Sequence, residues 1–185
     1  MQENKIESLI NSLFEEFKKL FSQKKPKQEE KVEIQEAKEE IMKFKRLDTP
    51  FKLSKTGSKR LSQCCEDIQK VVNEALYYRD VSVLCGYRSN EEQNDMYKKG
   101  TSKAKAGQSA HNFNPSLAID IVPYPIPMKG NEWDSDAKDW NELNELLMYI
   151  AQDKGVKLSW GGNWKSLVDK PHYEIENWKD LVKND

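Results

Sequence analysis

The sequence predicts an α+β fold, with a small, mostly antiparallel sheet and flanking helices, preceded by a helical N-terminal arm. From about residue 47 onward helical and strand patterns alternate, and two predicted strands have the strict two-residue alternation of a sheet with one solvated face. The first 46 residues differ in composition, because 21 of them are charged, compared with 40 of the remaining 139. We therefore expect an arm at residues 1–46 and a single globular domain at residues 47–185.

Apolar residues recur every three or four positions in the arm, from Ile6 to Phe21, and predict an amphipathic helix that ends at Pro26. A weaker helical pattern follows and is broken at Pro50. One interpretation is a hairpin of two helices that docks on the domain or on a second copy of the arm. A helix that attaches to a membrane surface or to a virion is the alternative.

Each element of the domain is predicted from periodicity and from turn residues. In chain order these are a helix at residues 57–78, a strand at 81–86, a helix with its N-cap at Ser89 or Asn90 and Gly100 beyond its end, a strand at 117–125, a helix at 136–153 closed by Gly155, and strands at 156–162 and 172–176.

Composition excludes some classes of partner. The formal net charge is −1 and the two signs are interspersed, so we expect no nucleic-acid surface. No stretch reaches the roughly 18 apolar residues of a membrane span, so we expect no transmembrane segment. The first residues also lack the continuous apolar region of a secretory signal. We therefore expect a protein made in the cytoplasm without a signal peptide.

The three cysteines, Cys64, Cys65 and Cys85, are an odd number in no disulfide spacing. Cys65 falls on a helical apolar stripe, and Cys85 continues the alternating strand face of Val81 and Val83. We interpret them as small buried residues of a reduced protein, with a cysteine metal site as the alternative.

Both histidines lie near carboxylates in the sequence. His111 lies in a polar, turn-prone segment nine residues before Asp120, and His172 opens the last predicted strand. Asp120 faces away from the aliphatic row of its strand and needs a partner, because an unpaired buried carboxylate is costly. Two imidazoles and one carboxylate are the ligand types of a catalytic zinc ion with an open fourth position. Residue types and spacing therefore leave two interpretations open, a Zn²⁺ site and two histidines in core or surface roles that need no metal.

A second carboxylate lies close to the last strand. Asp169 precedes His172 by three residues, and Pro171 stiffens the turn between them. With this spacing the carboxylate could reach a water molecule at the metal and serve as its general base.

Four segments of the domain resemble motifs of one enzyme family. "SAHNFNPSLAID" resembles the S-x-H…A-x-D motif, and "DKPHYE" the D-x-P-H-[FY]-E motif, of the D-alanyl-D-alanine carboxypeptidase-like zinc peptidases. "LCGYRSNEEQNDMYKKG" and "LSWGGNWKSLVDKPHYE" are similar to the S-G-[YF]-R-[ST]-x-x-E-Q and W-G-G-x-W…D-x-P-H-[FY]-E segments of its phage endolysin branch, the L-alanyl-D-glutamate endopeptidases. The resemblance covers about residues 47–185 and keeps the motif order.

The resemblance implies a role for each matching residue. His111, Asp120 and His172 would be the zinc ligands. Asp169 would be the general base, and Arg88 would stabilise the oxyanion of the tetrahedral intermediate. The positions that would contact substrate or orient other groups are Ser109, Gln93, Tyr87, Trp160 and Trp164. For the two tryptophans a place in the core is an equal alternative.

The function that the resemblance implies is zinc-dependent hydrolysis of an amide in the peptidoglycan stem peptide, in phage lysis or entry. The L-Ala–D-Glu bond is the expected target, and a D-Ala-D-Ala carboxypeptidase or dipeptidase is the alternative among enzymes. A zinc-bearing virion or binding module without turnover is the other alternative, but a structural zinc would need neither Asp169 nor Arg88. The protein would reach the wall after holin-type release or as a virion component, with the arm mediating self-association or partner attachment.

Overall fold

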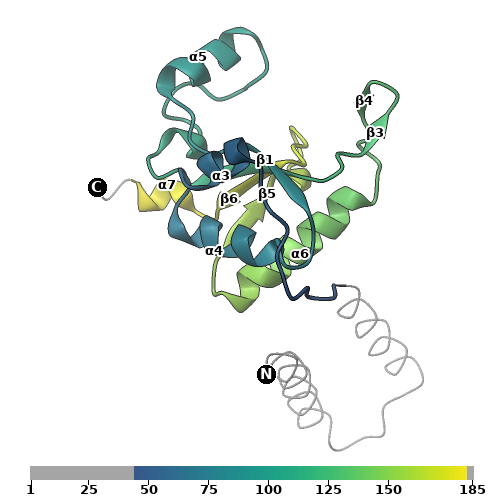
Figure 1. Cartoon of the computed structure of the whole chain (residues 1–185). Helices are drawn as coiled ribbons and strands as arrows, with labels where there is room; N and C mark the ends of the chain where they lie inside the picture. Colours follow the sequence, from purple (N-terminus) through teal and green to yellow (C-terminus); the bar gives the residue numbers. More distant parts are fainter. Residues whose placement is uncertain (1–43, 183–185) are drawn as a thin grey trace, which may run out of the picture. The chain divides into compact units, whose positions relative to one another are not determined.

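The computed structural model describes residues 44–182, and from Arg46 onward these residues belong to one compact unit (Figure 1). The helices predicted in the arm lie outside the described residues. Among residues 44–182, no helix combines the length and the apolar character needed to cross a membrane.

A four-stranded sheet forms the centre of the unit. Its strands are β1 (Val81–Cys85), β2 (Ala118–Pro123), β5 (Leu158–Trp160) and β6 (His172–Ile175), in the order β1-β2-β6-β5. All three neighbouring pairs are antiparallel, so the predicted fold class and its small antiparallel sheet are confirmed.

The two faces of the sheet differ in character. Ile119 and Ile121 of β2 are buried, and Tyr173 of β6 pairs with Ile119 on the same apolar face. Asp120 points to the opposite face, together with its β6 partner His172. The alternation of the sequence thus places one polar row on an otherwise apolar strand.

A β-bulge in β1 changes the predicted face of Cys85. Val83 pairs with Ile121, but the next pair is Cys85 with Asp120, so two residues of β1 oppose one of β2. The extra residue reverses the alternation, and Cys85 lies on the face of Asp120. The prediction that Cys85 continues the face of Val81 and Val83 is wrong for this reason.

The helix predicted at residues 57–78 is two helices, α3 (Lys55–Leu61) and α4 (Glu66–Ala75). Between them, Gln63 and Cys65 exchange backbone hydrogen bonds with Ser116, just before β2. These tertiary bonds replace helical ones, and Cys65 becomes the half-buried N-cap of α4. Its place on a continuous apolar stripe was therefore predicted wrongly, and the buried cysteine is Cys64.

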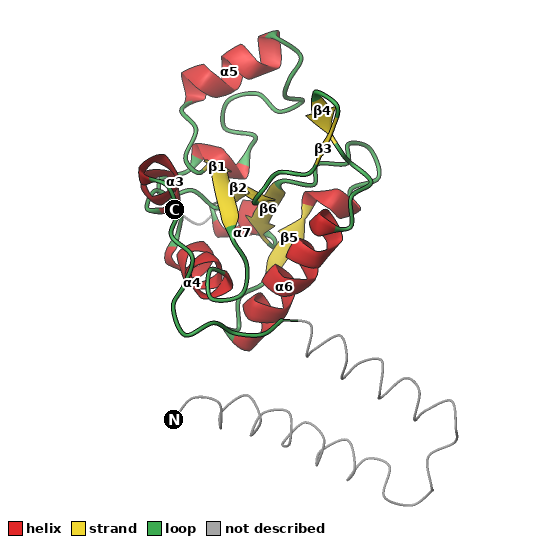
Figure 2. Cartoon of the chain, turned by 45° about the vertical axis from the view of Figure 1, so that its right-hand side comes forward, coloured by secondary structure: helices red, strands yellow, loops and turns green. Residues whose placement is uncertain are grey.

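The longest helix among residues 44–182, α6 (Asp139–Asp153), packs against β2 and β5 and also contacts α4. Its inner side contributes a row of buried apolar residues, Trp140, Leu143, Leu146, Leu147, Ile150 and Ala151. Gly155 follows at a φ of 68°, as expected for a residue that closes a helix. The core therefore lies between the apolar sheet face and the helices α4 and α6 (Figure 2).

The remaining elements frame the polar side of the sheet. They are α5 (Asn90–Lys98), the 3-10 helices η1 (Ala110–Asn112) and η2 (Gly161–Asn163), the hairpin of β3 (Met128–Lys129) and β4 (Glu132–Trp133), and α7 (Trp178–Leu181). Ser89 is the N-cap of α5 and forms a capping box with Glu92. Helix α5 and the β3–β4 hairpin project on the side away from α4 and α6 (Figure 1, Figure 2).

Candidate metal centre

Three side chains singled out in the sequence meet on the polar face of the sheet. Asp120 and His172 are direct partners across β2 and β6, so their side chains lie side by side. His111 comes from η1, where its backbone N–H donates to the Ser109 hydroxyl at 3.4 Å. A backbone hydrogen bond from Leu117 N to Ala110 O, 3.0 Å long, ties this turn to the start of β2. The sheet and one short turn therefore position all three groups.

The ring and carboxylate atoms of this group form a small triangle. His111 Nε2 lies 3.1 Å from Asp120 Oδ1 and 3.2 Å from His172 Nδ1, and His172 Nδ1 lies 3.2 Å from Asp120 Oδ1. Zinc–ligand bonds of about 2.0–2.1 Å in a tetrahedron place neighbouring ligand atoms about 3.3 Å apart. The triangle therefore has the size of one face of a zinc coordination tetrahedron.

Each imidazole has an outer partner that fixes its orientation. His111 Nδ1 is 2.6 Å from the Gly86 carbonyl oxygen, and His172 Nε2 is 3.1 Å from Glu174 Oε2. Both partners are hydrogen-bond acceptors, so each ring can donate its N–H outward and turn an unprotonated nitrogen toward the centre. Glu174 lies two residues after His172 on β6, so strand alternation puts both on one face, but nothing in the sequence indicated the Gly86 carbonyl.

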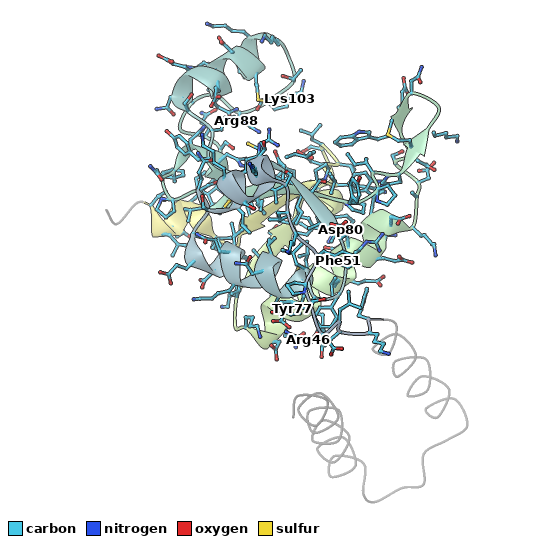
Figure 3. The ribbon with its side chains drawn as sticks, in the orientation of Figure 1. Arg46, Phe51, Tyr77, Asp80, Arg88 and Lys103 are labelled. Atoms are coloured by element: carbon cyan, nitrogen blue, oxygen red, sulfur yellow. The ribbon has the colours of Figure 1, made fainter. Side chains whose placement is uncertain are left out.

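Arg88 lies beside the triangle, on the side of the sheet from which α5 projects (Figure 3). Its Nη1 donates to Gln93 Oε1 at 3.1 Å, and its Nη2 lies 3.3 Å from Asp120 Oδ2. Nη2 also lies 3.5 Å from Cys85 Sγ. The second oxygen of Asp120 thus faces a guanidinium, while the first faces the two imidazoles.

Asp169 lies at the end of the loop that leads into β6. Its backbone N–H donates to the Gly161 carbonyl at 3.0 Å, and its own carbonyl accepts from His172 N at 3.2 Å. A Cβ at Gly161 would lie 2.5 Å from the Asp169 carbonyl oxygen, so only glycine permits this approach. Among residues 44–182, no donor forms a hydrogen bond with the Asp169 carboxylate, which is therefore available to accept a proton.

The pKa values reflect how tightly these groups are packed. Burial opposes ionisation of Asp120, but hydrogen bonds with His111 and His172 outweigh burial and hold the pKa of this carboxyl far below its ordinary value. Burial also opposes a charge on His111, yet Asp120 and Cys85 raise the pKa of this imidazole to about 10. The pKa of His172 is raised in the same way by Asp120 and Glu174, against burial.

The pKa of Asp169 is raised, whereas that of Asp120 is lowered. Burial raises the pKa of Asp169, and the negative charge of Asp120 adds to the effect. The positive charges of His172, His111 and Arg88 lower the pKa but do not cancel the increase. A carboxylate with a raised pKa is a stronger base, as a proton acceptor in catalysis requires.

Cys85 forms a second group with the same residues. Its thiol and one ligand atom each of His111 and Asp120 lie within 4.8 Å of one another. Burial opposes ionisation of the thiol, but the His111 ring and the Arg88 guanidinium outweigh burial and lower the pKa of Cys85. The interpretation of this cysteine as a core residue therefore missed its position beside the centre, because the bulge is not visible in the sequence.

The residues predicted to contact substrate lie in different environments. Gln93 is fully buried, and its amide joins Arg88 to Ser102 and Ala104. Trp160 is also buried, and its indole donates to the Lys170 carbonyl at 2.7 Å. In this structure the Gln93 and Trp160 side chains stabilise the residues to which they form hydrogen bonds.

The other predicted contact residues lie nearer to solvent. Trp164 is half-buried, with its ring centroid 4.9 Å from that of His172. Ser109 caps the turn that carries His111, and Tyr87 is half-buried between Gly86 and Arg88 in the chain. Contact of Tyr87 and Trp164 with substrate stays a prediction.

Two imidazoles and a carboxylate that meet at one point, with a second carboxylate and a guanidinium beside them, are the groups typical of metal-dependent hydrolases. The model of the phage L-alanyl-D-glutamate peptidase family matches residues 49–180, and the chain belongs to this family. The resemblance read from the motifs is thereby confirmed.

Two relatives illustrate the similarity. The peptidoglycan L-alanyl-D-glutamate endopeptidase CwlK of Bacillus subtilis (strain 168) is 32% identical over 111 residues, which are 52% of this chain and 60% of CwlK. The chain therefore spans less than two thirds of that relative. The crystal structure of the Serratia marcescens L-Ala D-Glu endopeptidase ChiX has a TM-score of 0.57 and 26% identity, covering 70% of this chain and 93% of ChiX.

Proposed function

We propose that this protein is a zinc-dependent peptidase that hydrolyses the L-alanyl–D-glutamate amide of peptidoglycan stem peptides. The observation that carries the proposal is the triangle of His111 Nε2, Asp120 Oδ1 and His172 Nδ1, in a chain of this family. The names of both relatives support the choice of bond.

The donor set supports zinc as the metal. Three ligands of the imidazole and carboxylate types are those of catalytic zinc sites, and each imidazole has the outer hydrogen-bond acceptor that such sites use. His111, Asp120 and His172 would hold the ion, which supplies a Lewis acid for the scissile carbonyl and lowers the pKa of a water molecule.

Asp169 is the proposed general base. It takes a proton from the attacking water as the new C–O bond forms, and gives it to the amine nitrogen as the C–N bond breaks. Its place at the turn before His172, fixed by the close approach to Gly161, keeps the carboxylate beside the centre. Its raised pKa strengthens it as a base.

Arg88 is the proposed electrostatic partner of the transition state. Gln93 and Asp120 hold its guanidinium in place before substrate arrives, so little reorganisation is needed when negative charge develops on the carbonyl oxygen. The same contact with Asp120 Oδ2 gives Arg88 a second role, since it orients the ligand carboxylate.

Digestion of purified sacculi with the zinc-loaded full-length chain tests the function, with the products read by mass spectrometry. New N-terminal D-Glu is the expected result. Released D-Ala would instead favour a D-Ala-D-Ala carboxypeptidase or dipeptidase. An absence of new products, with zinc bound, would favour a binding module. Protein carrying Asp169→Ala is the matched control for contaminating hydrolases.

The substrate also bears on where the protein acts. Because peptidoglycan lies outside the cytoplasm, the chain would act on the wall after holin-type release or as a virion component. Residues 1–46 would then mediate self-association or attachment to a partner.

A further inference from the structure

Cys85, Asp120 and His172 lie in one row across three neighbouring strands. Cys85 of β1 is the direct partner of Asp120 on β2, and Asp120 is the direct partner of His172 on β6. Directly paired residues direct their side chains to the same face, with Cβ atoms about 4.5–5.5 Å apart. The central carboxylate is therefore flanked by a thiol on one side and an imidazole on the other.

The thiol is close enough to serve as a metal ligand. Cys85 Sγ and ligand atoms of His111 and Asp120 lie within 4.8 Å of one another, and the cysteine is free and half-buried. Its polar contacts include the His111 ring, Arg88 Nη2 at 3.5 Å and the carbonyl of Gly86 at 3.6 Å. The last two are weak because sulfur is a poor hydrogen-bond partner, so little would be lost if the sulfur turned toward an ion.

We propose that the centre contains a second, overlapping metal position, in which a thiophilic divalent cation is bound by Cys85, His111 and Asp120. This second position rests on the proposed function in one respect only, because it shares His111 and Asp120 with the proposed zinc site. Thiolate is a soft ligand and selects soft cations such as cadmium, whereas the set with His172 offers only nitrogen and oxygen. On binding, the S–H bond breaks, the proton goes to solvent, and a metal–sulfur bond forms.

The neighbouring charges define the effect of such binding. Arg88 Nη2 contacts both Cys85 Sγ and Asp120 Oδ2, so a cation between these two side chains repels the guanidinium. The second position is therefore weaker than the first for zinc. When filled, it takes Asp120 away from Arg88 and inhibits the peptidase.

Cadmium titration of the metal-free full-length chain tests the second position directly, because a cadmium–thiolate bond gives an ultraviolet charge-transfer band. We expect the band in the wild type and in His172→Ala, because this substitution leaves Cys85, His111 and Asp120 in place. The band should be lost in Cys85→Ser and in His111→Ala. Cys65→Ser, which removes a half-buried thiol outside the group, should keep it and is the matched control.

The result does not depend on turnover, so it can be distinguished from a failure of the proposed function. A band that persists in Cys85→Ser, or an absence of any band in the wild type, overturns the second position. Zinc stoichiometry measured on the same variants separates the two sites, since Cys85→Ser should still bind one zinc per chain and His172→Ala should not.

Discussion

Asp120 connects both imidazoles of the centre to Arg88, because one of its oxygens faces the two imidazoles and the other the guanidinium. The sequence singled out this residue, since a lone carboxylate on a strand of small apolar residues needs partners. It also indicated both histidines. The thiol of Cys85 and the carbonyl of Gly86 were not predictable, because their positions depend on a bulge and on a backbone contact.

Replacement of the base should be separable from loss of a metal ligand. Asp169→Ala should keep the bound zinc and the fold and lower kcat by about 10²–10⁴-fold, because only proton transfer is removed. His172→Ala should lose the metal together with the activity. Elemental analysis and kinetics on the same samples measure both, with the exposed Asp136→Ala as a control. Near-normal turnover of Asp169→Ala would point to Glu174 as the base.

Zinc uptake should release protons. In the metal-free centre the pKa of His111 is about 10 and that of His172 is also raised, so near neutral pH the imidazoles hold protons that zinc must displace. The apparent zinc affinity should therefore fall as the pH is lowered. Calorimetry in buffers of different ionisation enthalpy counts the protons. An affinity that does not change across the neutral range would contradict this account.

Tyr173 has a buried hydroxyl for which residues 44–182 provide no hydrogen-bond partner. Tyr173→Phe should raise the free energy of unfolding by up to about 1–3 kcal/mol, the cost of an unsatisfied buried polar group. Burial raises the pKa of this phenol in the folded state. Wild-type stability should thus fall as the pH rises above the ordinary tyrosine value of about 10, where the unfolded chain ionises first. Denaturation at neutral and alkaline pH checks both effects.

Secondary-structure elements that depend on neighbouring residues in the chain could be predicted from the sequence. The capping box of Ser89 and Glu92 begins α5, and alternation identified β2 as a strand with one polar position. The break between α3 and α4 was missed, because its residues are compatible with a helix and only hydrogen bonds to Ser116 interrupt it. The β3–β4 hairpin was missed because each strand has only two residues, too few for any period to show.

The contact between α3 and β1 should be intolerant of added volume. A Cβ at Gly86 would lie 2.2 Å from the Arg60 carbonyl oxygen, so Gly86→Ala must separate the two elements. This shift also moves the Gly86 carbonyl that orients His111. We expect a loss of about 1–3 kcal/mol in stability and weaker zinc binding.

Gly57→Ala is the matched control for this substitution. Gly57 lies inside α3, and a Cβ added there would have a side-chain oxygen as its nearest neighbour, at 3.3 Å. The substitution should therefore be neutral or slightly stabilising. Thermal denaturation and zinc titration of both variants provide the comparison, and equal behaviour of the two would contradict the steric argument.

Contacts of Arg46 hold the first residues of the folded unit against α4 and the residues that follow it. Its guanidinium lies 3.7 Å from the ring centroid of Tyr77, and its Nε is 2.9 Å from Glu74 Oε1. Leu47 N donates to the Tyr77 carbonyl at 2.7 Å. Figure 3 shows Arg46 and Tyr77 together at the edge of the unit. These contacts place the start of a minimal domain at Arg46.

A chain that begins at Arg46 should fold, bind zinc and cleave soluble muropeptides at a rate like the full chain, because every group of the centre lies beyond residue 84. It should lose self-association or attachment to a partner. A chain that begins at Leu47 lacks the Arg46 contacts and should be less stable by about 1 kcal/mol. Turnover on soluble substrate, mass in solution and denaturation compare the three proteins. An inactive Arg46 chain would show that the arm is part of the catalytic unit.

The proposed ligands His111, Asp120 and His172 come from three separate segments, a 3-10 turn and two strands, which only the folded chain brings together. A metal that binds the native state alone stabilises it by an amount that grows with the logarithm of free metal, about 4 kcal/mol at a thousandfold excess over Kd. Under the proposed function, the supply of zinc would therefore set how long the protein survives as well as how fast it works. We expect the same chain to unfold more often, and to be cleaved faster by proteases, where zinc is scarce.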